Sequence, residues 1–99
     1  MNGTLTIRRT YSQYTERYTW SADYTLDNGI SKNFGAPEVS IDAVEHALHT
    51  LLFNLIIGKH TGVNLTVKLP QGVTLTDAYK TQVSDKYTAD GTIATITFE

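Results

Sequence analysis

The chain has 99 residues, of which 40% are hydrophobic and 18% are charged, and its formal net charge is −2. This composition is typical of a globular chain and excludes intrinsic disorder, so we expect residues 1–99 to form a single domain. The chain contains no cysteine, which excludes disulfides, thiolate catalysis and sulfur-ligated metal centres.

Two strands are predicted in the N-terminal quarter of the chain. Apolar and polar residues alternate over Thr4–Thr10, which is the pattern of a half-buried strand. The polar segment Ser12–Arg17 turns the chain, and a second alternating run, Tyr18–Leu26, is rich in residues that favour strands. The residues predicted to face inward on this second strand are Tyr18, Trp20, Ala22, Tyr24 and Leu26.

A third strand and a helix follow. The run 27–29, Asp-Asn-Gly, is typical of a tight hairpin turn, so Ile30–Phe34 is expected to fold back on the second strand until Pro37 ends the pairing. Ser40 is suited to cap a helix that ends at Gly58. Apolar residues recur at helical spacing along this helix and form one wide stripe made of Ile41, Val44, Leu48, Leu51, Leu52 and Leu55.

Two further strands are predicted towards the C-terminus. Alternation indicates one strand at Val63–Leu69 and a final strand at Thr92–Phe98. Strict alternation in the final strand places Ile93 on the face opposite to Ile96 and Phe98.

The segment between these two strands, Val73–Tyr87, is ambiguous. Its apolar residues have the spacing of a short helix, which we favour, whereas its content of threonine, tyrosine and valine also suits a strand. The residues at helical spacing are Tyr79, Val83 and Tyr87. The sequence therefore predicts an α+β fold: an antiparallel sheet of four to five strands packed on one long amphipathic helix, in the order β-β-β-α-β, a short helix or strand, and β.

The first five predicted elements follow the order that opens ribonuclease-H-like domains. Those nucleases gather carboxylates on the first strand, the helix and the fourth strand in order to hold divalent metal. Neither Thr4–Thr10 nor Val63–Leu69 contains an acidic residue, and Glu45 alone cannot form such a site. We therefore infer no relationship to that family, and we predict no catalytic residues.

Localisation and cofactors are inferred from signals that the chain lacks. Residues 1–4 show no basic segment followed by an apolar run, so no secretory signal is predicted. The longest apolar stretch, Leu51 to Ile57, is interrupted by Asn54 and is too short to span a bilayer. We expect a cytoplasmic, non-enzymatic protein with neither a membrane partner nor a bound cofactor, because no glycine-rich phosphate loop or nucleophile motif is present.

Partner-binding residues are predicted on the N-terminal hairpin, which comprises the first two strands and the turn between them. All three arginines of the chain lie there among tyrosines, and these residue types dominate the energetics of protein interfaces. They also suit nucleic acid, but Glu16 and Asp23 dilute the positive charge, so nucleic acid is not the expected partner. The alternation assigns Trp20 and Tyr24 to the core. The predicted partner-binding residues are Arg8, Arg9, Tyr11, Tyr14 and Arg17.

The polar face of the helix offers a metal-site alternative. Asp42, His46 and His49 have the i, i+4, i+7 spacing of a carboxylate and two histidines on one face. No fourth ligand can be identified, and an isolated pair of histidines on a helix is more often a solvated face. We therefore predict no metal site.

Two apolar residues, Phe53 and Ile57, fall on this polar face. Either the Val73–Tyr87 segment packs over them, which we favour, or another chain does, because an exposed apolar cluster is unusual on a monomer. In the second case the residues of a dimer or partner patch are His49, Thr50, Phe53 and Ile57.

These features predict a small accessory or inhibitor protein that acts by binding another protein, and its size is typical of phage-encoded or mobile-element proteins. One alternative is a structural subunit that self-associates, for example as a homodimer, through the helix patch or through sheet edges on the threonine-rich face of the sheet. Another is a small-ligand or metal-binding module that uses His46 and His49.

Overall fold

The structure is a computed structural model that describes residues 1–27, 31–36 and 42–99, with the side chains of residues 17, 18, 31–36, 42 and 43 outside that description. The predicted turn residues Asn28 and Gly29, the strand terminator Pro37 and the helix cap Ser40 therefore lie outside the described residues. The elements are β1 (Asn2–Ser12), β2 (Arg17–Leu26), β3 (Ser31–Ala36), α1 (Asp42–Ile57), β4 (Val63–Lys68), α2 (Asp77–Thr88) and β5 (Ile93–Phe98).

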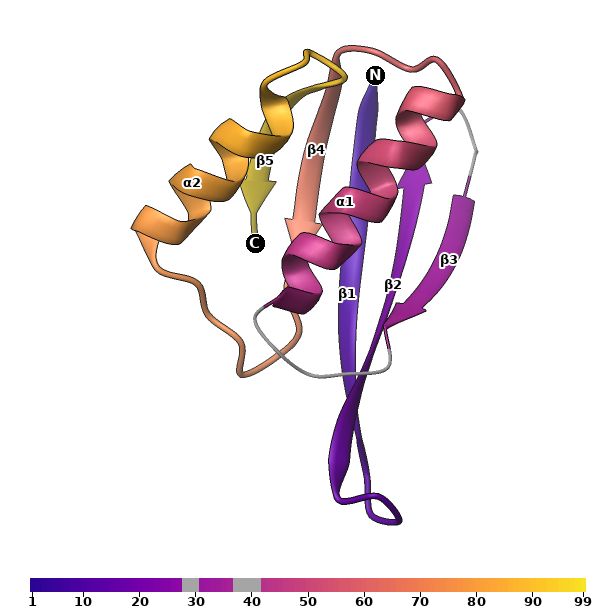
Figure 1. Cartoon of the computed structure of the whole chain (residues 1–99), viewed down its shortest axis with the longest axis vertical. Helices are drawn as coiled ribbons and strands as arrows, with labels where there is room; N and C mark the ends of the chain where they lie inside the picture. The colour runs from indigo at the N-terminus through magenta and orange to yellow at the C-terminus, as the bar shows by residue number, and fades with distance from the viewer. Residues whose placement is uncertain (28–30, 37–41) are drawn as a thin grey trace.

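The five strands form one sheet in the order β3-β2-β1-β4-β5 (Figure 1). β2 runs antiparallel to both β1 and β3, whereas β4 is parallel to β1 and β5 is parallel to β4. A mixed α+β fold is thus confirmed, but the prediction of an antiparallel sheet is wrong. The physical reason is the connections: β4 and β5 each follow a helix, which returns the chain to its starting end, so that the next strand runs parallel.

Both helices lie on the same side of the sheet (Figure 1): the predicted long helix is present as α1, and α2 shares the covering of the sheet with it. The favoured short helix within Val73–Tyr87 is present as α2, which continues one residue further, to Thr88. Its start is fixed by Thr76, whose hydroxyl oxygen accepts a hydrogen bond of 3.2 Å from the Tyr79 backbone N–H.

The core lies between the two helices and the inner face of the sheet. Alternate residues of the strands supply one half of it and the apolar stripes of the helices supply the other. Trp20 and Tyr24 are buried, as the alternation predicts. The fully buried large side chains are Leu5, Leu48, Leu51, Leu55, Leu65, Ile93, Val44, Val63, Val67 and Val83.

β5 contains an irregularity that changes which residues face the core. Val63 pairs with Ile93 but the next residue, Asn64, pairs with Thr95, so one residue of β5 is extra at this point. A bulge of this kind shifts the alternation by one position. Ile96 and Phe98 therefore pack against the core that also contains Ile93, and the predicted opposition of these residues is wrong.

Neither of the two helices in the described part of the chain covers the outer face of the sheet (Figure 1). The strand register aligns four threonines in one row across β2, β1, β4 and β5, namely Thr25, Thr4, Thr66 and Thr97. None of the four is buried, which agrees with the predicted threonine-rich solvated face on β1 and β2.

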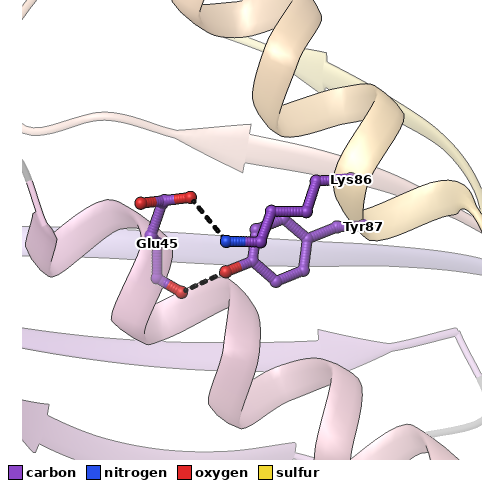
Figure 2. Close-up of polar contacts among 3 residues, drawn as sticks. All are labelled: Glu45, Lys86 and Tyr87. Carbon is purple, nitrogen blue, oxygen red and sulfur yellow. Dashed lines mark hydrogen bonds and ion pairs between the residues drawn. The ribbon is translucent and has the colours of Figure 1, made fainter.

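Polar contacts fix α2 against the N-terminal half of α1 (Figure 2). The Tyr87 hydroxyl donates a hydrogen bond of 3.2 Å to the Glu45 backbone carbonyl, and the Lys86 Nζ lies 3.3 Å from the Glu45 carboxylate. The same ammonium lies 5.5 Å from the centre of the Tyr87 ring. Burial raises the pKa of the Tyr87 hydroxyl, the Lys86 charge opposes this shift and the Glu45 charge adds to it.

Candidate functional site

The β1–β2 hairpin extends beyond its neighbours in the sheet. β1 pairs with β4 only over Asn2–Thr6, and β2 pairs with β3 only over Trp20–Thr25, yet the β1–β2 pairing continues to Ser12 and Arg17. Residues 10–19 therefore form a two-stranded extension, here called the distal ribbon, which projects from one end of the molecule (Figure 1).

The local sequence explains why the distal ribbon keeps its strand pairing. Thr10 pairs with Thr19, and cross-strand pairs of β-branched residues stabilise antiparallel strands. The Thr19 hydroxyl also donates to the Thr10 carbonyl at 3.4 Å. In the loop that closes the ribbon, Glu16 has a φ of 53°, a left-handed conformation that is uncommon for a residue other than glycine.

Two of the predicted partner-binding residues are tyrosines presented by this ribbon. Tyr14 lies in the loop at the tip and is fully exposed, and half of the Tyr11 surface is exposed. Tyrosine combines a large apolar ring with a hydroxyl, so it gains much from burial against a partner at a small cost in side-chain entropy. The tip of the ribbon thus offers area and a hydrogen-bonding group to a second molecule.

The predicted arginines do not join the tyrosines in one surface. Arg8 lies on the outer face of the sheet and forms an ion pair with the Asp23 carboxylate. Arg9 points to the opposite face at the base of the ribbon, where its guanidinium donates to the Gln71 carbonyl at 3.4 Å. Arg17 begins β2 opposite Ser12, but its side chain is outside the described part of the chain. The structure therefore gives Arg8 and Arg9 intramolecular partners at the base of the ribbon.

The second predicted surface lies at the C-terminal end of α1. Phe53 is 60% exposed and Ile57 is 64% exposed, so the favoured prediction that Val73–Tyr87 covers them is wrong. The reason is that α2 is held at the other end of α1 by Glu45. Ile56, which sequence reasoning missed, is 50% exposed and extends this surface, here called the α1 patch: Phe53, Ile56 and Ile57.

The remaining predicted patch residues flank this surface, and the metal-site alternative involves the same helix face. His49 is exposed beside Phe53, and Thr50 is partly exposed, with its carbonyl accepting a hydrogen bond from the Asn54 side chain at 2.8 Å. His46 is also exposed, whereas the Asp42 side chain is not described. Among the residues that the structure describes, no group of three metal-ligating side chains is found.

A third surface, which sequence reasoning missed, lies where α2 borders β5. An open groove of about 490 Å³ is lined on the helix side by Asp77, Lys80, Thr81, Ser84 and Asp85, and on the strand side by Ile96, Thr97 and Phe98. The polar residues follow the spacing i, i+3, i+4, i+7 and i+8, which is one face of a helix. That spacing is visible in the sequence, but only the position of α2 beside an edge strand makes it a groove.

A scan against models of known protein families found no match to this chain, and a search of curated proteins found none that matches it significantly. Neither helix, over the parts of the chain that are described, is long and apolar enough to cross a membrane.

Proposed function

We propose that this protein is a small non-enzymatic accessory or inhibitor protein that acts by binding another protein through the distal ribbon. The observation that carries this proposal is the projection of the ribbon beyond the sheet with the fully exposed Tyr14 at its tip and Tyr11 on its side. A projecting element with exposed tyrosines can enter a concave site on a partner.

Electrostatics around the ribbon favour a protein over a nucleic acid as the partner. The positive charge of Arg8 is compensated by Asp23, and Glu16 adds a negative charge near the tip. Nucleic-acid binding depends on several uncompensated cations that contact phosphates. The aromatic and hydroxyl groups of the tyrosines suit the mixed apolar and polar surfaces of proteins.

The test is affinity capture of the tagged protein from its native host lysate, with mass spectrometry of stoichiometric partners. We expect one dominant partner, and we expect the double variant Tyr11→Ala/Tyr14→Ala to lose it. Lys68→Ala, an exposed change on the outer sheet face away from the ribbon, is the matched control. Retention of the same partner by the double variant, with its fold verified by circular dichroism, would contradict a ribbon-mediated function.

A second candidate function is self-association through the α1 patch. Its support is the exposure of Phe53, Ile56 and Ile57 at half or more of their surface, on adjacent turns of one helix. Light scattering over a range of concentrations tests it. A homodimer that Phe53→Ser converts to a monomer would support this role, whereas a concentration-independent wild-type monomer would remove it.

A further inference from the structure

β5 is an edge strand, and its backbone geometry shows which groups are left at that edge. The Glu99 N–H donates to the Val67 carbonyl at 2.8 Å, and the Glu99 carbonyl accepts from the Leu69 N–H at 3.1 Å. In a parallel ladder both backbone groups of a residue point to the same side, and successive residues alternate. Thr97, like Glu99, therefore points its backbone towards β4, whereas Ile96 and Phe98 point theirs away from β4.

The groove beside α2 runs along this edge. The Ile96 and Phe98 side chains pack towards the helical side of the sheet, whereas Thr97 belongs to the threonine row on the outer face. Because the groove contacts side chains from both faces of the sheet, it lies along the edge of β5. One face of α2 forms its far wall, so the outward backbone groups of β5 border an open channel.

We propose that this groove binds an extended segment of another protein, which adds to the sheet as a sixth strand beside β5. The two N–H and two C=O groups of Ile96 and Phe98 supply the main-chain pairing that strand addition requires. The half-buried side chains of Ile96 and Phe98 contact apolar side chains at alternate positions of the segment. The α2 wall has two carboxylates, Asp77 and Asp85, against one ammonium, Lys80, so it favours a basic side chain in the segment.

This site is separate from the distal ribbon and from the α1 patch, so it extends the proposed function without depending on it. None of the groove residues belongs to β1, β2 or α1. A partner held at the ribbon and a peptide held at the groove would contact different elements of the same small protein.

The first test uses a phage-displayed library of short random peptides, followed by calorimetry with a synthetic peptide of the selected sequence. Methylation of single backbone nitrogens along this peptide then tests whether the peptide binds as an added strand, because each methyl group removes one N–H donor. We expect a loss of about tenfold in affinity at every second position, where an N–H pairs with β5, and little change at the intervening positions. Failure to select any peptide, or a methylation profile without this alternation, would overturn the proposal.

Two protein variants locate the peptide. Ile96→Pro removes an outward N–H without removing a hydrogen bond to β4, which is the arrangement in which edge strands tolerate proline. Ser84→Trp fills the groove from the exposed helix face and leaves the strand unchanged. Each is expected to weaken the selected peptide by about tenfold or more, whereas Tyr11→Ala/Tyr14→Ala binds it normally.

The outcomes separate this proposal from its competitors. Unchanged peptide affinity in the folded Ser84→Trp variant would place the peptide elsewhere and refute the groove. A wild-type dimer that Ile96→Pro disperses would identify a second copy of this chain, not a partner segment, as the occupant of the edge. Loss of the lysate partner in the ribbon variant with retained peptide binding would support two independent sites.

Discussion

In the distal ribbon and at the β5 edge, the described strands have no neighbouring strand on at least one side, but the two regions expose different chemical groups. On the ribbon the backbone groups of β1 and β2 are largely paired with each other, and side chains such as Tyr14 face the solvent. On the β5 edge the side chains of Ile96 and Phe98 are partly buried, and their backbone groups face outward. Recognition by the ribbon would therefore depend on residue identity, whereas recognition by the edge would depend on main-chain geometry.

The two regions also differ in how much the fold depends on them. Residues at the base of the hairpin, such as Leu5, are fully buried beneath the helices, whereas residues 10–19 contribute almost no buried apolar surface among their described side chains. Two-stranded extensions of this kind add little stability of their own. Burial and exposure are thus separated along the length of one hairpin, whereas in β5 partly buried side chains and outward-facing backbone groups belong to the same residues.

The largest expected effect tests this separation. Leu5→Ala should lower the free energy of unfolding by about 2–5 kcal/mol, because it leaves a cavity in the core. Tyr14→Ala should change it by less than about 0.5 kcal/mol, because the side chain is fully exposed. Urea denaturation measures both values, and comparable losses in the two variants would show that the ribbon is part of the stabilising core.

A smaller effect concerns the helix that forms the groove wall. Thr76→Ala should destabilise the protein by about 1 kcal/mol, because the Tyr79 backbone N–H loses its capping oxygen. Thr76→Ser, which keeps the hydroxyl, is the control and should be close to wild type. Equal urea midpoints for the alanine variant and the wild type would show that this cap does not define the start of α2.

Tyr87→Phe is expected to lower the free energy of unfolding by about 1 kcal/mol, because it removes the hydrogen bond to the Glu45 carbonyl.

The pH dependence of stability tests the same contact in a second way. Burial raises the pKa of Tyr87 in the folded protein above its unfolded value of 10.0, so its contribution is complete below that pH and is lost at higher pH. The midpoint temperature of thermal unfolding should therefore fall less steeply across the alkaline range in Tyr87→Phe than in the wild type. Some fall should remain, because burial also raises the pKa of Tyr24.

The smallest effect is expected for the ion pair that accompanies this hydrogen bond. Lys86→Ala should cost about 0.2–1 kcal/mol, because the Lys86 side chain is largely exposed and its attraction to Glu45 is screened by solvent. The loss should shrink at high salt. A salt-independent loss would instead indicate that packing of the lysine chain over the Tyr87 ring is the main contribution.

The sequence predicted correctly the features that depend on residues close together in the chain. Alternation placed Trp20 and Tyr24 in the core, and the spacing of Val83 and Tyr87 favoured α2. Strand direction was not local: the alternating pattern of β4 is the same for parallel and antiparallel pairing, so only the crossover through α1 decides it. The bulge near Ala94 likewise depends on pairing with β4.

The candidate sites were predictable to a lesser degree. Exposure of Tyr14 followed from its place in a polar turn, whereas the exposure of Phe53 depended on where a distant helix docks. That docking includes the contact of Tyr87 with Glu45, which no spacing along the chain reveals. The groove at β5 needed the strand order of the whole sheet before it could be recognised.

The central position of β1 has a consequence for synthesis of the chain. β1 joins the two halves of the sheet, and its residue Asn2 pairs with Asn64 of β4. At ordinary translation rates the roughly 60 intervening residues take about 3–12 s to make. During that interval β1 and β2 can already form their hairpin, but the other edge of β1 stays unpaired. The nascent chain thus carries an open strand edge that closes only when β4 emerges, and such an edge can pair with another chain in the meantime.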